Sequence, residues 1–162
     1  MDTEGTIEPA TAAEARERYE ALGPTAQVVV KEVAKAMEMD KAEYRERVTS
    51  EVVETARDAL FASMLAVRVG TRDEFDDWVA ERDGYDVHEA GSEHVDNVVW
   101  HVAPAAETVV AATFQDEREA AVGTLRRQAF GRVYEGLVAG EPDDADERSD
   151  EADDSDGQAG GE

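Results

Sequence analysis

The stretch VVWHVAPAAETVVAATF, residues 98–114, decides the fold class that the sequence predicts. Its first half has the period of two that is typical of a strand, because successive side chains of a strand point to opposite faces. Three bulky residues share one face: Val98, Trp100 and Val102. A short loop with Pro104 separates this segment from a β-branched run over 108–114, which predicts a neighbouring strand.

A further strand is expected before this stretch. Tyr85, Val87 and Glu89 alternate with polar residues, and Gly91 with Ser92 supplies a turn. Three strands joined by short connections favour a small antiparallel meander. The sequence therefore predicts an α+β protein in which helices cover one face of a three-stranded antiparallel sheet, with a long C-terminal helix packed on it.

Helices are expected before and after the strands along the chain, because apolar residues in those segments recur every three or four positions. A capping residue followed three positions later by Glu marks four helix starts. These pairs are Thr11 with Glu14, Asp40 with Glu43, Thr71 with Glu74, and Asp116 with Glu119. The expected helices span 11–23, 24–37, 40–70, 71–84 and 116–138, with a possible break of the third at Thr49 and Ser50. The second carries the apolar stripe Ala26, Val29, Val30, Val33 and Met37.

The last of these helices is locally basic in an acidic chain. Residues 118–132 carry four arginines against the single acid Glu119. Arg126 falls inside the apolar half of the helix, so its side chain must reach the edge or pair with a buried carboxylate. Arginine is suited to bidentate pairing with anions. The candidate binding residues for an anion or a partner carboxylate are Arg126, Arg127, Gln128, Arg132, Tyr134 and His101.

Small residues on the same helix suggest an interface. Gly123 and Gly131 lie two turns apart with Arg127 between them, which allows another backbone to approach closely. We therefore expect an interface that includes these three residues, first of all in a homodimer. For the arginines of this face, the sequence favours a structural role over anion binding: they would pair with acidic helices of the same domain, and the glycines would admit one of its own helices.

The net charge of the chain indicates adaptation to a salty environment and does not indicate what the protein binds. The 162 residues contain 16 Lys+Arg and 40 Asp+Glu, a net charge of −24. Only three of the bases are lysine, and 27 Ala and 20 Val stand against five Leu and one Ile. This composition is typical of a protein adapted to molar salt, where a Debye length of roughly 3 Å screens carboxylate repulsion. An acidic protein from an ordinary cell is the alternative.

The sequence divides into a single domain over 1–138 and an acidic tail over 139–162. From 141 onward there are eleven acids and one base, with no hydrophobic residue larger than Ala. Such a segment is expected to be disordered. No apolar run approaches the roughly 20 residues of a membrane span, and the N-terminus lacks a signal peptide pattern, so we expect a cytoplasmic protein.

No arrangement typical of catalysis is present. The chain lacks cysteine, and its three histidines, His88, His94 and His101, do not show the spacing of a metal site. No serine lies in a nucleophile elbow, and no glycine-rich phosphate loop occurs, so neither cofactor nor metal is expected. Nucleic acid is not favoured as a partner of the four arginines, because no aromatic platform lies near them.

Three segments resemble a known family: AEARERYEALGPTAQVVVKEVAKAM (13–37), ETARDALFASMLAVRVGTRDEF (54–75) and TFQDEREAAVGTLRRQAFGRVYEGL (113–137). They are similar to short haloarchaeal proteins without an assigned function. The resemblance implies a salt-adapted cytoplasmic protein and supplies no catalytic residues.

We therefore expect a non-catalytic domain that acts through protein contacts or self-association. The Gly123–Gly131 helix face, and Trp78 and Trp100, which we expect to be exposed, would take part in these contacts. The alternative function is a small-molecule or anion-binding sensor or enzyme that uses the arginines of the last helix.

Overall fold

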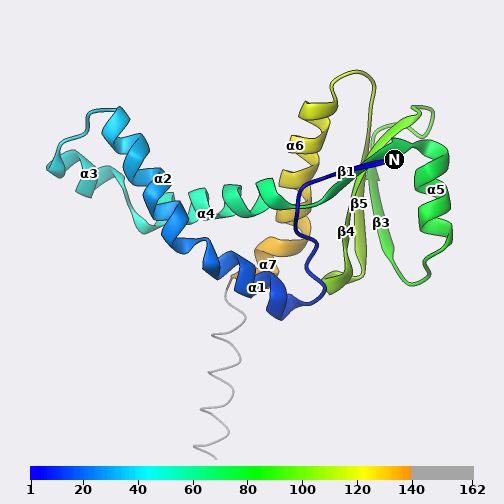
Figure 1. Cartoon of the computed structure of the whole chain (residues 1–162), viewed down its shortest axis with the longest axis horizontal. Coiled ribbons are helices and arrows are strands. Elements are labelled where there is room, and N and C mark those ends of the chain that lie inside the picture. Colours follow the sequence, from blue (N-terminus) through cyan, green and yellow to red (C-terminus); the bar gives the residue numbers. More distant parts are fainter. Residues whose placement is uncertain (140–162) are drawn as a thin grey trace, which may run out of the picture.

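A five-stranded mixed sheet lies at the centre of the computed structural model, which describes residues 1–139 (Figure 1). The strands are β1 (Asp2–Glu4), β2 (Val67–Thr71), β3 (Asp86–Ala90), β4 (Asn97–Ala103) and β5 (Thr108–Phe114). Their order is β1-β2-β4-β5-β3, and every pair is antiparallel except β3 with β5. The predicted α+β class is confirmed, whereas the three-stranded antiparallel meander is wrong.

The meander fails because β3 does not pair with β4. It runs parallel to β5 at the edge of the sheet, with His88 opposite Val110. All five residues of β3 are exposed, which suits an edge strand, whereas six of the seven residues of β4 are buried. Strand β4 therefore takes a central place between β2 and β5.

Strand β2 occupies a segment that was expected to be helical. The preceding helix ends at Met64, and Val67 and Val69 then alternate with less buried residues in the period of a strand. Val67 fits the helical spacing of the residues before it, but both valines are buried in the core, on a strand that pairs with β1 and β4. Burial within the sheet thus overrides the local pattern.

The helices begin mostly where the caps predict. They are α1 (Ala12–Ala21), α2 (Gly23–Ala36), α3 (Lys41–Arg47), α4 (Ser50–Met64), α5 (Arg72–Ala80), α6 (Arg118–Ala129) and α7 (Glu135–Val138), with the 3-10 turn η1 (Pro104–Ala106) and the π-helical turn η2 (Phe130–Tyr134). Thr11, Asp40 and Thr71 accept hydrogen bonds from the expected backbone amides, and the possible break at Thr49 is real. The cap predicted at Asp116 is wrong, because α6 begins at Arg118 without a side-chain cap.

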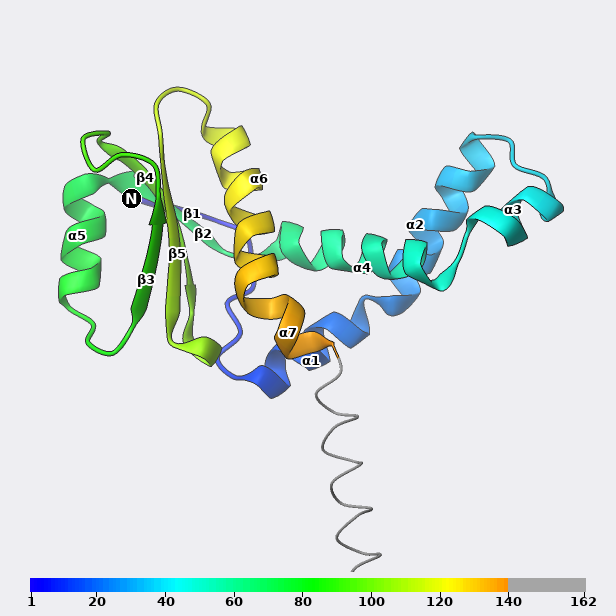
Figure 2. The same cartoon turned by 180° about the vertical axis from the view of Figure 1, so that it is seen from behind.

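Helices cover both faces of the sheet, not one as expected. On one face α6 packs against β4 and β5, with α1 and α4 beside it, and on the other face lies α5 (Figures 1 and 2). The core on the α5 side includes Trp78 and Trp100, whose exposed fractions are 8% and 0%. The expectation that these tryptophans are exposed is therefore wrong, and neither offers a contact surface.

A helical arm, residues 23–56, projects from this body (Figures 1 and 2). It consists of α2, α3 and the first part of α4, and α2 packs along α4. None of the helices within residues 1–139 is both long and apolar enough to cross a membrane. Apart from Ala139, the predicted acidic tail lies outside the described residues.

The capping box at the start of α5 gives a test of local stability. The Thr71 hydroxyl accepts from the amide of Glu74 at 3.2 Å, and the Glu74 carboxylate accepts from the amide of Thr71 at 2.9 Å. We expect Thr71→Ala to lower the free energy of unfolding by about 1 kcal/mol. Denaturant unfolding in molar KCl measures this change. The control Thr55→Ala makes the same substitution inside α4, where no such loss is expected, and equal losses in both variants would contradict the prediction.

Candidate functional site

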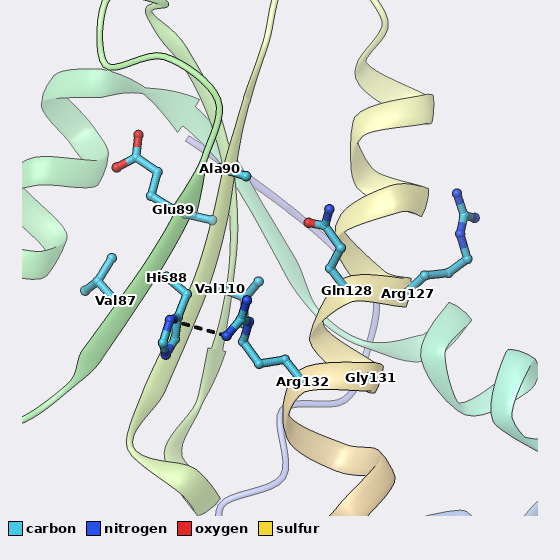
Figure 3. A pocket seen from close by; sticks show the side chains of 10 residues that line it. Val87, His88, Glu89, Ala90, Val110, Arg127, Gln128, Gly131 and Arg132 are labelled. Atoms are coloured by element: carbon cyan, nitrogen blue, oxygen red, sulfur yellow. Dashed lines mark hydrogen bonds between the residues drawn. The ribbon is translucent and has the colours of Figure 1, made fainter.

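The segments α6, η2 and α7 follow one another without a break and are together called the last helix. A hollow of about 820 Å³ lies between the edge strand β3 and this last helix (Figure 3). Its polar lining includes His88, Arg127, Gln128 and Arg132, and Val110 of β5 forms an apolar floor on the same face of the sheet as His88. Figure 3 shows His88, Gln128 and Arg132 turned toward the space between strand and helix, while Arg127 extends away from the sheet at its rim. The structure thus brings together three of the predicted binding residues, Arg127, Gln128 and Arg132.

The sequence prediction missed His88, which faces Arg132 across the hollow. The guanidinium Nη1 of Arg132 lies 3.5 Å from Nδ1 of His88, and both side chains are exposed. Glu89, the next residue of β3, points to the opposite face and pairs with Arg72 of α5 at 2.7 Å. Alternation along β3 therefore turns the imidazole into the hollow and the carboxylate out of it.

The arginines of the last helix differ in their partners. Arg118 pairs within the domain, as the structural interpretation expects, but its partners are Glu4 at 2.8 Å and Asp2 at 3.2 Å on strand β1 and not an acidic helix. Within residues 1–139, neither Arg127 nor Arg132 makes an ion pair, and Arg127 donates only to the hydroxyl of Thr124 at 3.3 Å. The two arginines of the hollow are thus unneutralised by any described carboxylate.

Arg126 has a structural role that neither predicted option describes. Its Nε donates to the backbone carbonyl of Leu65 at 2.9 Å, just after the end of α4. Gly5, whose φ is +100°, lies against both groups, and a Cβ there would come within 2.8 Å of the Arg126 guanidinium. This arginine therefore joins the last helix to the α4–β2 junction and does not line the hollow.

His101 and Tyr134 meet in the core rather than at the hollow. Nδ1 of His101 donates to the carbonyl of Ala66 at 2.6 Å, so Nε2 accepts from the Tyr134 hydroxyl, also at 2.6 Å. Both residues are fully buried. Burial lowers the pKa of His101 and raises the pKa of the Tyr134 phenol. The neutral imidazole thus links β4, the segment before β2, and the last helix.

The π-helical turn η2 places Tyr134 in the core while Gly131 and Arg132 face the hollow. A π turn adds a residue to the helical turn and so rotates the side chains that follow it. Phe130, Val133 and Tyr134 are buried in η2, and Gly131 and Arg132 are exposed. Such turns occur frequently at functional sites.

The predicted interface residues fall at two places on the last helix. Gly131 lines the hollow, Gly123 lines a second hollow, of about 440 Å³, between α4 and α6, and Arg127 lines both. A Cβ at Gly131 would meet no atom within 4 Å, and one at Gly123 would meet only the Arg127 guanidinium at 3.7 Å. No described helix therefore uses these glycines for close packing, although a glycine inside a helix costs about 1 kcal/mol relative to alanine.

The helical arm carries an apolar groove that the sequence prediction missed. The groove has a volume of about 370 Å³ and lies between α2 and α4. Val30 and Ala34 of the predicted stripe are buried, but Val29, Val33 and Met37 remain exposed. The width of this apolar stripe in the sequence could have indicated the groove, because a single neighbouring helix, α4, covers only part of such a stripe.

Within residues 1–139, no three His, Asp or Glu side chains gather in a way that could hold a metal ion. The hollow offers hydrogen-bond donors of arginine and glutamine side chains, and the groove offers apolar side chains.

Residues 6–135 match the model of a family of unknown function, DUF5809. The chain belongs to this family. The DUF5809 match includes the helical arm, the buried His101–Tyr134 pair and the hollow, and it leaves out β1 and the acidic tail. The expected membership of an uncharacterised family is confirmed. No curated protein and no solved structure matches the chain.

The buried imidazole predicts a dependence of stability on pH. The ordinary pKa of 6.5 applies to the unfolded chain, and burial lowers the folded value, so the unfolded chain binds more protons below about pH 6.5. The free energy of unfolding should therefore fall as the pH drops below this value, with a slope approaching about 1.4 kcal/mol per pH unit.

Denaturant unfolding between pH 5 and 8 in molar KCl measures how much of the pH dependence of the free energy of unfolding comes from His101, and His101→Gln should remove that part. The control His94→Gln replaces a histidine on the exposed β3–β4 connection and should keep it. The same slope in wild type and His101→Gln would show that His101 is not its source.

Proposed function

We propose that this member of the DUF5809 family is a non-catalytic, salt-adapted protein of the cytoplasm that acts through protein contacts, first of all with a second copy of itself. The helical arm would form the contact. One observation carries the proposal: five of the seven large hydrophobic side chains that the described chain exposes lie on the arm. They are Val28, Val29, Val33, Met37 and Val52.

The shape of the arm suits pairing between identical copies. Val29, Val33 and Met37 repeat every four residues and so form a ridge along α2. The ridge borders the apolar groove, whose other wall includes Val52 of α4. In a two-fold pair, the ridge of each copy can enter the groove of the other, because both copies present the same surface.

The charge of the arm supports a second copy as the occupant. Residues 23–48, the part of the arm that carries the ridge, contain five bases and five acids, a net charge of zero, and the whole arm has a net charge of −2 in a chain of −24. All three lysines of the chain lie here: Lys31, Lys35 and Lys41. Two strongly acidic molecules repel each other least where their surfaces are neutral and carry both signs. The exposed apolar ridge coincides with this neutral region.

Mutation of the ridge tests the proposed contact. Val33→Glu places a charge in the apolar surface and should convert a dimer into a monomer in molar KCl, as measured by analytical ultracentrifugation. Val87→Glu makes the same change at an exposed valine of β3, outside the arm, and should leave the mass unchanged.

Two results would refute the contact on the arm. One is a wild-type chain that stays monomeric at high protein concentration, and the other is a dimer that survives Val29→Glu and Val33→Glu together. A dimer broken by Gly131→Leu instead would place the contact at the Gly123–Arg127–Gly131 face.

The proposed salt adaptation has its own test. Among residues 1–139 there are 29 acids and 15 bases, so folding brings many unpaired carboxylates together. Molar salt screens this repulsion over roughly 3 Å. We expect the thermal midpoint of unfolding to rise markedly between low and molar KCl, as measured by circular dichroism. A midpoint that does not move with salt would exclude the adaptation.

A further inference from the structure

We propose that the hollow between β3 and the last helix is a binding site for a small organic anion that carries at least two negatively charged oxygens, such as a phosphate monoester or a dicarboxylate. Arg132, His88 and Gln128 would hold the anionic end, with Arg127 at the rim. This site does not depend on the proposed self-association, because the helical arm lies elsewhere on the molecule.

The charge around the hollow supports an anion. The described surface is acidic, yet this hollow is lined by two guanidinium groups, an imidazole and an amide. Glu89, the carboxylate of β3 at the hollow, is turned to the other face and pairs with Arg72 at 2.7 Å. An anion could therefore reach Arg132 without breaking an ion pair among the described residues. Charge-assisted hydrogen bonds to such arginines are roughly twice as strong as neutral ones.

The geometry favours an anion with more than one oxygen. Nη1 of Arg132 lies 3.5 Å from Nδ1 of His88, so nitrogen groups from the helix and from the strand meet at one point. The planar guanidinium has five N–H donors, and this contact uses one of them. Two oxygens of a phosphate or carboxylate can then bind the guanidinium fork while Gln128 donates from the next helical turn.

The floor and the helix backbone leave room for a carbon body. Val110, which is 3% exposed and pairs with His88, forms an apolar floor. Gly131 lies on the π-helical turn, and a Cβ there would meet nothing within 4 Å. Its missing side chain keeps the hollow open toward the helix backbone. The volume of about 820 Å³ lies in the range of small-molecule sites, about 300–1,000 Å³.

Titration of the full chain tests this site. We would follow the backbone amides by NMR in molar KCl, so that chloride is always in excess, and add glycerol 3-phosphate or succinate, with glycerol as the uncharged control. Saturable changes in the amide chemical shifts should appear in β3 and over residues 127–132 with either or both anions, and not with glycerol. The two anions distinguish a phosphate from a carboxylate ligand.

Variants locate the site. Arg132→Gln keeps a polar side chain but removes the charge and should weaken binding about tenfold or more, and Gly131→Leu should fill the hollow and abolish binding. Arg18→Gln removes an exposed arginine from α1 and should leave the affinity unchanged. Absence of saturable shifts with both anions, or equal affinity in wild type and Arg132→Gln, would overturn the proposal. The mass of Arg132→Gln should equal that of the wild type, which separates this result from self-association.

Discussion

The buried hydrogen-bond chain from Ala66 through His101 to Tyr134 fixes the last helix against the sheet, and the surrounding structure depends on it. Nearby, Arg126 donates to the carbonyl of Leu65. The last helix therefore binds two consecutive carbonyls of the α4–β2 junction: that of Leu65 directly, through Arg126, and that of Ala66 indirectly, through Tyr134 and His101. A neutral imidazole is needed, because it must donate from one nitrogen and accept at the other. The direction of α4, and with it the position of the helical arm, follows from this junction.

Local features of the fold could be predicted from the sequence, and pairings between distant segments could not. The caps at Thr11, Asp40 and Thr71 depend on residues three positions apart, so the pattern predicts them directly. Strand β2 was missed because Val67 continues the spacing of the preceding helix, and only pairing with the distant strands β1 and β4 makes it a strand. The parallel pairing of β3 was missed because it depends on the central place that β4 takes in the sheet.

The candidate site divides in the same way. Arg127, Gln128 and Arg132 follow one another closely on one helix, and the structure places all three at the hollow. His101 and Tyr134 were grouped with them by residue type, but their strand and helix faces turn them into the core. His88 could not be joined to Arg132 without knowing that β3 lies beside β5. The groove of the helical arm required the actual packing of α2 on α4, which leaves half of the apolar stripe uncovered.

The two walls of the hollow are held in place by different contacts. The last helix is tied into the core by buried side chains, whereas β3 is held by one ladder to β5 and by the contacts of Glu89 with Arg72 and of His88 with Arg132. Every residue of β3 is exposed, and local opening costs least where few side chains are buried. A molecule that contacts both walls would stabilise the strand as well as bind to it. Occupancy of the hollow and order of the sheet edge are therefore thermodynamically linked, and each should strengthen the other.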